Sequence, residues 1–377
     1  MKKLALINQR FIKAAQNNQI DELKNLLDQG ANISADNDKA LILSACNGSL
    51  EIVKFLISRG VNIHAESDVA LKGSAEGGHL EIVKFLVKHG ANIHADDDGA
   101  LRLSAHTGHL ETVKFLLTQG ASIHVNDDEA LRLSASSGQL EVVKFLVTQG
   151  ANIHANDDYA LRNSAYRGHF EIVKFLVTHG ANIHANEDEA LRWSAKNGHL
   201  ETVKFLIEND ANIHANNDEA LKCSSNKDHL DIVKFLIEND ANIHANDDEA
   251  LRLAACYGHL EVVKLLITQG ANIHADDNGA LKMASRYGEL EIVKFLITQG
   301  ADIHSDGDYA LKWSAQNGHV DVWQLLSALI QEEKLLVAAS DSMLVLPAVA
   351  SVALVAASDF ILKTQRVKLK KSLRPKI

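Results

Sequence analysis

The sequence is poor in proline and cysteine, and it has no long apolar run near its start. Its only prolines, Pro347 and Pro375, lie close to the end, so the structure of most of the chain makes no use of proline. Three cysteines with no CxxC pair are typical of a protein whose thiols stay reduced. The opening stretch, MKKLALINQRF, meets polar residues before it reaches the apolar length of a signal peptide. We therefore expect an intracellular protein, in the cytoplasm or the nucleus.

Positive charge is scarce in the body of the chain. The formal net charge is −11, yet seven basic residues and no acidic residue follow Leu362. Everything before this tail therefore carries about −18. A body this acidic repels phosphate backbones, so we expect it to bind no nucleic acid. The sequence also has no Gly-rich phosphate loop, no G-x-S-x-G and no H-E-x-x-H, and we expect no enzymatic activity.

A 30-residue repeat takes up most of the chain. Asp-x-Ala-Leu recurs at this period without a slip, with Asn278 at the one place where the Asp is replaced. A degenerate copy that starts at Asn8 makes eleven units. A period this strict predicts units that stack in register, because independent loops would tolerate insertions. The motif starts at Asp38, Asp68, Asp98, Asp128, Asp158, Asp188, Asp218, Asp248 and Asp308.

Each unit predicts two helices. In the unit that starts at Asp68, small and apolar residues at helical spacing follow an Asp that suits an N-cap. A second helix, LEIVKFLV from Leu80, has apolar residues on more than one stripe, as packing on both sides requires. Gly90 suits a left-handed C-cap, and ANIHADD then forms a connecting loop or hairpin anchored by Ile93. The sequence thus predicts an all-α repeat solenoid of stacked helix-turn-helix units.

Two parts of the unit resemble the ankyrin repeat: Gly-His-Leu-Glu-x-Val at the start of the second helix and Gly-Ala-Asn-Ile after it. The resemblance covers the chain from about Asn8 to Ile330. The units are shorter than the usual length of about 33 residues, and Asp replaces Thr-Pro before the first helix, which accounts for the missing prolines. The short, nearly identical units, rich in Asn, Ile and Lys, are also similar to ankyrin arrays encoded by giant DNA viruses of protists.

The resemblance implies a non-enzymatic scaffold that binds a partner protein through its concave face, as a monomer, inside a cell or an infected host cell. We expect an N-terminal capping unit over 1–37, nine repeats over 38–307, a C-terminal unit with an extended second helix over 308–336, and a tail over 337–377. Asn25 stands where other units carry a Phe that we expect to be buried, which suits a polar cap.

Histidine recurs at two places in the unit. Stacked helical units lie about 8–10 Å apart, whereas zinc lies about 2.0–2.1 Å from a histidine nitrogen, so two loop histidines cannot share one zinc ion. We expect no metal and no cofactor. The resemblance implies that the loop histidine replaces an Asn that hydrogen-bonds the loop backbone; the second histidine is placed to satisfy an orphan backbone group. The loop set is His64, His94, His124, His154, His184, His214, His244, His274 and His304. The second set is His79, His109, His169, His199, His229, His259 and His319.

Positions of the unit that vary are free to serve recognition. These are position two and positions nine and ten, which the resemblance places at the finger tip and on the concave face. Aromatic and Arg side chains carry most interface energy, so we look for them there. Plain solvated surface is the alternative for this set, and half-buried core is the alternative for the two Trp residues at position six. The predicted partner-binding residues are Tyr159, Tyr166, Arg167, Trp193, Tyr257, Arg286, Tyr287, Tyr309 and Trp313.

Two further sequence patterns concern the charge pairing and the local stability of the array. Nine units carry a basic residue four positions after their first residue, and we call this set the basic stripe. Pairing with the unit's first residue is expected to explain the stripe, with acidic-partner binding as the alternative. The stripe is Lys72, Arg102, Arg132, Arg162, Arg192, Lys222, Arg252, Lys282 and Lys312. Asp210, Asp228 and Asp240 replace glycines at left-handed positions, which predicts that the array is softest over 205–245.

The tail leaves several interpretations open. Residues 343–358 carry no charge and precede the basic run. A membrane anchor would need about 20 apolar residues, and this stretch is shorter and holds Pro347. The alternatives are a helix that caps the last repeat and a partner-binding segment; Leu346 and Pro347 suggest an F-box-like motif of the kind that some viral ankyrin proteins carry. The second functional hypothesis is therefore an adaptor, whose array selects a target while the C-terminal segment docks a membrane or a ubiquitin-ligase component.

Overall fold

The computed structural model describes residues 2–342, which form twenty-two helices and no strand. The helices belong to two compact bodies, the first ending at Asn212 and the second beginning at Ile213. The predictions about the tail from residue 343 onward, including the Leu346–Pro347 motif and the membrane anchor, lie outside the described residues. The prediction of an all-α repeat solenoid is confirmed.

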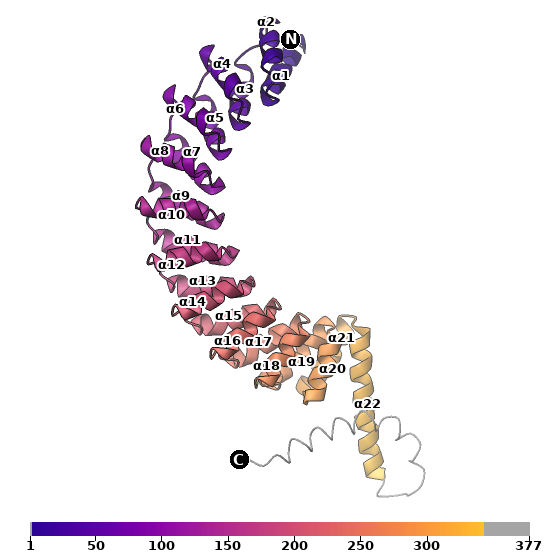
Figure 1. Ribbon diagram of the computed structural model, residues 1–377. Coiled ribbons are helices and arrows are strands. Elements are labelled where there is room, and N and C mark those ends of the chain that lie inside the picture. Colours follow the sequence, from indigo (N-terminus) through magenta and orange to yellow (C-terminus); the bar gives the residue numbers. More distant parts are fainter. Residues whose placement is uncertain (1, 343–377) are drawn as a thin grey trace. The chain divides into compact units, whose positions relative to one another are not determined.

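Helices alternate between a first and a second helix of each unit (Figure 1). The first helices of the first body are α1 (Lys2–Gln16), α3 (Ala35–Cys46), α5 (Ala65–Glu76), α7 (Ala95–Thr107), α9 (Val125–Ser136), α11 (Ala155–Arg167) and α13 (Ala185–Lys196). Its second helices are α2 (Ile20–Asp28), α4 (Leu50–Ser58), α6 (Leu80–Lys88), α8 (Leu110–Thr118), α10 (Leu140–Thr148), α12 (Phe170–Thr178) and α14 (Leu200–Glu208).

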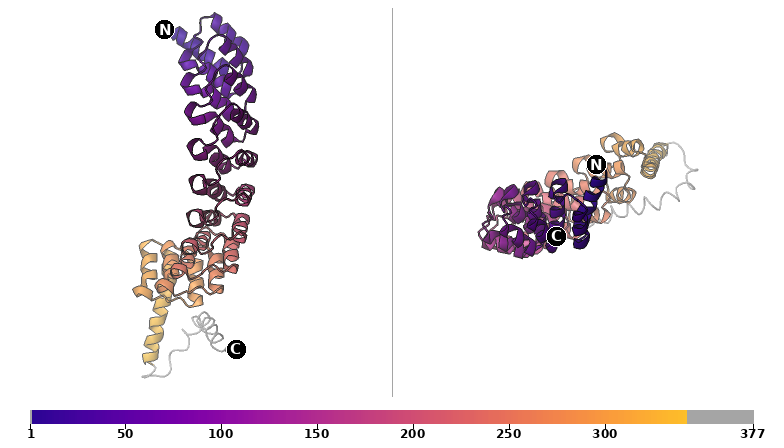
Figure 2. Two further views of the ribbon diagram at one scale, coloured as in Figure 1. Left: turned by 90° about the vertical axis from the view of Figure 1, so that its left-hand side faces the viewer. Right: turned by 90° about the horizontal axis from the view of Figure 1, so that it is seen from above.

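The second body repeats this order. Its first helices are α15 (Ala215–Asn226), α17 (Ala245–Cys256), α19 (Ala275–Tyr287) and α21 (Ser305–Gln316). Its second helices are α16 (Leu230–Glu238), α18 (Leu260–Thr268), α20 (Leu290–Gln299) and α22 (Val320–Ser342). Within each body, first helices pack on first helices of the neighbouring unit and second helices on second helices. In the first body the two kinds of helix form two columns (Figure 2).

The core of each unit comes from small residues in the first helix and branched residues in the second. In α7, Leu101 and Ala105 are at most 1% exposed, and Ser104 is buried because its hydroxyl donates to the Leu101 carbonyl. In α6, Val83 and Leu86 are fully buried. The phenylalanine of the second helix, expected to be buried, is only half-buried, as Phe85 shows. It can still contact the neighbouring second helix, since the rings of Phe205 on α14 and Phe170 on α12 meet edge to face with centroids 5.8 Å apart.

A left-handed turn connects each unit to its first helix. Asp96, Asp97 and Asp98 all have φ between 51° and 54°, and the three matching residues of every repeat are left-handed as well. Left-handed backbone costs most residues about 1–2 kcal/mol, and Asn and Asp are the side chains that tolerate it best. The acidic and amide residues of the ANIHADD stretch are thus explained by backbone geometry. The connection is this turn rather than a β-hairpin.

The Asp that opens most motifs is buried and links two successive loops, although Asp308 is only half-buried and Asp38 Oδ1 has no hydrogen-bond partner. Asp68 is 3% exposed, and its Oδ1 accepts from His64 Nδ1 at 3.1 Å and from the backbone amide of Asn92 at 2.8 Å. The prediction of an N-cap for its own helix therefore missed its main role, because its left-handed backbone turns the carboxylate toward the next unit's loop. The degenerate first unit makes the same bond, since the Asn8 side chain accepts from the Asn32 amide at 2.9 Å, but Asn8 does so from inside α1 without left-handed backbone.

The prediction for Gly90 is confirmed, whereas the prediction for Ile93 is not. Gly90 has φ +98°, as a left-handed C-cap requires. Ile93, expected to anchor the loop, is only half-buried, and the alanines on either side, Ala91 and Ala95, are buried instead. Val61 and Val125 take these two positions in other units, so the loop is held by small apolar side chains together with the buried Asp.

The last helix, α22, continues past residue 336, where we expected the C-terminal unit to end. Apolar side chains along it are exposed, including Val320 at 57% and Trp323 at 41%. Its second half is fixed by Glu333, whose carboxylate accepts from His304 Nε2 at 2.6 Å. None of the helices in the described part of the chain is long and apolar enough to cross a membrane.

Candidate functional site

Four of the predicted residues lie together on α11 and α13, and we call them the α11–α13 cluster: Tyr159, Tyr166, Arg167 and Trp193. Three side chains follow one face of α11. Asn163 Nδ2 donates to the Tyr159 hydroxyl at 2.7 Å, and Arg167 Nε donates to Asn163 Oδ1 at 3.4 Å. The guanidinium carbon of Arg132 lies 5.4 Å from the centroid of the Tyr159 ring, within cation–π range. This face of α11 is therefore held in one arrangement.

Tyr166 and Trp193 join α11 to α13. Their ring centroids are 5.3 Å apart in an edge-to-face arrangement, a favoured geometry for aromatic pairs. Trp193 is half-buried, as its core alternative anticipated, while Tyr166 is 42% exposed. Trp193 thus supports a tyrosine that remains accessible.

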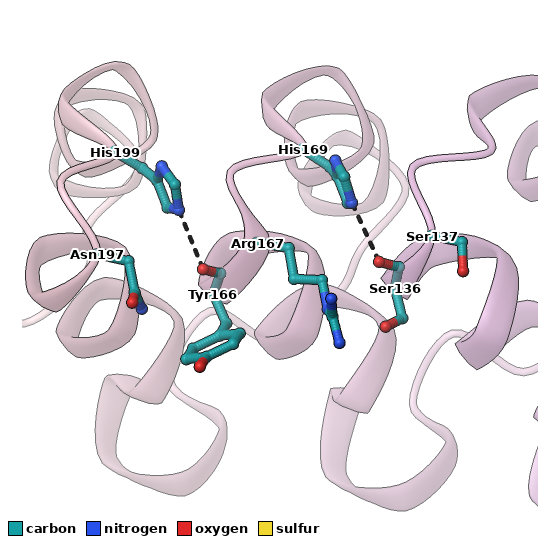
Figure 3. Close-up of a pocket in the computed structure, with 7 residues that line it drawn as sticks. All are labelled: Ser136, Ser137, Tyr166, Arg167, His169, Asn197 and His199. Atoms are coloured by element: carbon teal, nitrogen blue, oxygen red, sulfur yellow. Dashed lines mark hydrogen bonds between the residues drawn. The ribbon is translucent and has the colours of Figure 1, made fainter.

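An open depression of about 540 Å³ lies beside this pair. Figure 3 shows the Tyr166 ring and the Arg167 guanidinium pointing to the same side, with His169 and His199 opposite. The depression exists because the preceding unit carries only serines where Tyr166 and Arg167 stand. Its lining residues are Ser136, Ser137, Tyr166, Arg167, His169, Asn197 and His199.

Four more predicted residues meet in the second body, on α19 and α21, and form the α19–α21 cluster: Arg286, Tyr287, Tyr309 and Trp313. The guanidinium carbon of Arg286 lies 4.9 Å from the centroid of the Trp313 ring and 5.7 Å from that of Tyr287. Tyr309 meets Trp313 edge to face, with centroids 4.7 Å apart. Tyr287 is 50% exposed and Tyr309 is 37% exposed, while Trp313 is half-buried.

The ninth predicted residue, Tyr257, stands at the end of α17. It is 56% exposed and stacks on His259, with centroids 6.4 Å apart. Next to it, burial raises the pKa of the Cys256 thiol, and burial likewise raises the pKa of Cys46 at the same position of an earlier unit. Both side chains are therefore thiols rather than thiolates at neutral pH, which makes them poor nucleophiles and poor metal ligands.

The loop histidines bind the buried carboxylates. Nδ1 of His94 lies 3.0 Å from Asp98 Oδ1, and the same contact recurs along the ladder at 2.7 to 3.1 Å. The resemblance implied a bond from the histidine side chain to the loop backbone, and this is wrong. That bond belongs to the asparagine two residues earlier, since Asn92 Oδ1 accepts from the His94 amide at 3.0 Å. The asparagine already fills this place, so the imidazole is left to fix the carboxylate.

The second set of histidines ties neighbouring units together. Nε2 of His169 donates to the Ser136 carbonyl at 3.0 Å, and Nε2 of His199 donates to the Tyr166 carbonyl at 3.0 Å (Figure 3). Both carbonyls lie in the last turn of a first helix, where intrahelical partners are missing. His79 and His259 make the same bond. In residues 2–342, no group of three His, Cys, Asp or Glu is placed to hold a metal ion.

The basic stripe is paired, but with different partners from those expected. Arg102 donates to the backbone carbonyls of Asp97 and Asp96, and its Nη1 lies 2.7 Å from Glu129 of the next unit. Because the Asp98 carboxylate contacts His94, the Arg binds the carbonyls of the left-handed turn instead. Lys72 and Lys282 likewise bind the side chain of an Asp 24 residues on. These contacts leave little of the stripe for a partner.

The structure therefore brings the nine predicted residues into two clusters and one separate tyrosine. Sequence reasoning missed Asn163, which orients Tyr159 and Arg167, and it missed Asn197 and the two serines that shape the depression. The serines and Asn197 stand at positions nine and ten, which the sequence singled out as variable. Selecting only aromatic and Arg side chains excluded them.

Paired antiparallel helices stacked at a fixed period, with few contacts beyond the neighbouring unit, define an α-solenoid repeat protein. The family profile described as ankyrin repeats (3 copies) matches it seven times in overlapping stretches, at residues 11–97, 52–129, 71–157, 131–217, 161–247, 195–277 and 251–334. The chain belongs to the ankyrin repeat family. No curated protein matches it. Ankyrin repeats are in general protein–protein interaction modules, and proteins built from them are typically scaffolds rather than enzymes.

Proposed function

We propose that this chain binds a partner protein through its first-helix surface, defined as the exposed ends and turns of the first helices that carry the two clusters and Tyr257. The interaction class follows from the family. The site, the monomeric state and a cytoplasmic or nuclear location are proposals.

One observation carries the choice of surface. Between residues 20 and 319 the exposed large hydrophobic side chains are Tyr166, Leu230, Tyr257, Tyr287 and Tyr309. Four of these five are tyrosines on first helices, although second helices contain more large apolar residues. Tyrosine is enriched where binding energy is concentrated, because its ring is large and its hydroxyl stays compatible with water.

The side chains around these tyrosines are already held in place. Asn163 fixes Tyr159, Trp193 supports Tyr166, and Arg286 lies against Trp313. Ordering a flexible side chain on binding costs about 0.5–1.5 kcal/mol. A surface whose aromatic and Arg groups are ordered beforehand avoids much of that cost, which supports a recognition role over plain solvated surface.

The test is affinity capture from native cells with mass spectrometry. The bait carrying Tyr166→Ala, Tyr257→Ala and Tyr287→Ala is compared with the unchanged chain and with a matched control, Lys54→Ala, Lys114→Ala and Lys174→Ala on second helices. We expect the tyrosine variant to lose a specific protein that both other baits retain. Equal recovery by all three would place the binding energy elsewhere.

A further bait tests the adaptor hypothesis. It ends after Ser342, because α22 runs unbroken to that residue and an earlier cut would divide the helix. Under the main proposal this bait keeps the partner. Loss of the partner only from the shortened bait would favour a docking role for the segment that follows.

A further inference from the structure

The side chains that line the depression between α9, α11 and α13 determine which kind of ligand it can bind. Of its seven lining residues, Arg167 carries a permanent positive charge, and none carries a carboxylate. Two nearby carboxylates are held by other groups: Glu189 pairs with Arg162, and Asp188 binds His184 and the backbone amide of Asn212. The exposed Glu171 and Glu201 stand on second helices and do not line the depression. A cationic group thus stands exposed in an open hollow of an otherwise acidic chain.

Arg167 is positioned for a carboxylate. Its Nε donates to Asn163 Oδ1, which also accepts from the Ser136 hydroxyl at 3.2 Å, so the guanidinium is anchored at one edge. Anchoring through Nε leaves the two terminal nitrogens on the side toward which the Tyr166 ring points (Figure 3). Paired guanidinium nitrogens match the two oxygens of a carboxylate, which makes this a strong charge-assisted contact.

Tyr166 supplies an apolar wall next to that charge. Its ring is held by Trp193, so it cannot turn into the hollow without losing that contact. A ligand that offers a carboxylate to Arg167 would place its neighbouring side chain against this ring. The net negative charge of the array gives no long-range attraction for an acidic partner, so binding must come from these short-range contacts.

We infer that this depression binds an acidic segment of a partner protein, with an Asp or Glu carboxylate on Arg167 and an adjacent apolar side chain on Tyr166. This inference rests on the proposed function, because it assigns a ligand chemistry to one part of the first-helix surface. A protein segment fits better than a nucleic acid, whose repeated phosphates the acidic array repels.

The test uses a displayed library of short random peptides, selected on the full chain. Peptides that are enriched are synthesised and titrated against the unchanged chain, Arg167→Glu, Tyr166→Ala and the control Lys88→Glu. They are also titrated against the double variant Tyr257→Ala with Tyr287→Ala and against the triple tyrosine variant. Lys88 is an exposed residue at the end of a second helix, so its variant has the same change in net charge at a distance from the depression. Each peptide is also made with Gln for Glu and Asn for Asp, and with phosphoserine at the acidic position.

We expect enriched peptides to share an acidic residue beside an apolar one. Their affinity should fall about tenfold or more for Arg167→Glu and for the amide-substituted peptide, and it should not change for Lys88→Glu. Enrichment of peptides without acidic residues, failure to enrich any peptide, or a clear preference for phosphoserine would each overturn the carboxylate assignment.

Two outcomes separate this inference from the proposed function. If Arg167→Glu binds the peptides normally while Tyr257→Ala with Tyr287→Ala does not, the depression is wrong and the first-helix surface stands. If neither Arg167→Glu nor the triple tyrosine variant loses affinity, both the depression and the surface are wrong.

Discussion

The backbone amide of Asn182 donates a hydrogen bond to Oδ1 of Asp158, 24 residues earlier, at 2.8 Å. This bond joins the left-handed turn at the start of α11 to the loop that leads into α13. Asp158 is 4% exposed, and its carboxylate also accepts from His154 at 3.1 Å. The bond recurs along the array. An inserted residue between the motif and the next loop would move the amide away from the carboxylate, which accounts for the strict period.

Replacing this carboxylate tests its role. Asp158→Ala removes the acceptor of both the Asn182 amide and the His154 side chain, and we expect the free energy of unfolding to fall by about 1–3 kcal/mol. Asp158→Asn should cost much less, because Asn278 already makes the bond in another unit, to the Asp302 amide at 2.8 Å. Urea denaturation followed by circular dichroism would measure both. Equal losses for the two variants would show that the bond adds little and that only volume matters.

The left-handed turn predicts how substitutions at an exposed residue change stability. Asp157 has φ 53° and lies in the middle of its turn. A β-branched residue tolerates this conformation poorly, so Asp157→Val should lower the free energy of unfolding by about 1–2 kcal/mol. Asp157→Gly should stay within about 1 kcal/mol of the unchanged chain, because relief of strain offsets the entropy of glycine. The account of the turn fails if thermal unfolding ranks valine at or above glycine.

Residues 205–245 should still be the softest part of the array. Asp210, Asp228 and Asp240 have φ of 70°, 61° and 69°, and the Ser225 hydroxyl is buried without a hydrogen-bond partner. Restoring glycine at the three Asp positions should raise stability, by up to about 1 kcal/mol at each. Hydrogen exchange is the direct measurement. Amides here that exchange no faster than those near Asp98 and Asp128 would refute the prediction.

His304 should make the end of α22 sensitive to pH. Hydrogen bonds to Glu333 and then Asp308 raise the pKa of this histidine above its usual value near 6.5. Because the raised value belongs to the folded state, the stabilisation is fully present below about pH 6.5 and is lost as pH rises through the folded pKa. Protection factors of amides around Glu333 should therefore fall as the pH rises above about 6.5. His304→Asn should remove that dependence, and a variant that keeps it would assign the effect to another group.

The fold was predictable from the sequence because successive units repeat the same spacing of helix, cap and loop residues. Spacing fixed the two helices, and Gly90 fixed the end of the second. What could not be read was the direction of the Asp68 carboxylate, which depends on three consecutive left-handed residues. The same geometry redirected the loop histidines and the basic stripe, so one unpredicted turn accounts for three revised contacts.

The candidate site was predicted in part. Variable positions that carry Tyr, Trp or Arg are exposed or half-buried on first helices, because the side chains at these positions are not needed for packing between units. Which of them meet was not predictable, because Tyr166 and Trp193 lie one unit apart and at different positions of the unit. The depression was missed because small residues create it.

The most direct test of the central claim is photo-crosslinking from defined positions. A benzophenone amino acid is placed at Tyr166 or Tyr257 on first helices, or at Lys54 or Lys174 on second helices, and the full chain is irradiated in native cells. The account predicts crosslinks to one specific protein from the tyrosine positions and none to that protein from the lysine positions. Crosslinks to a specific protein from the second helices alone would contradict it.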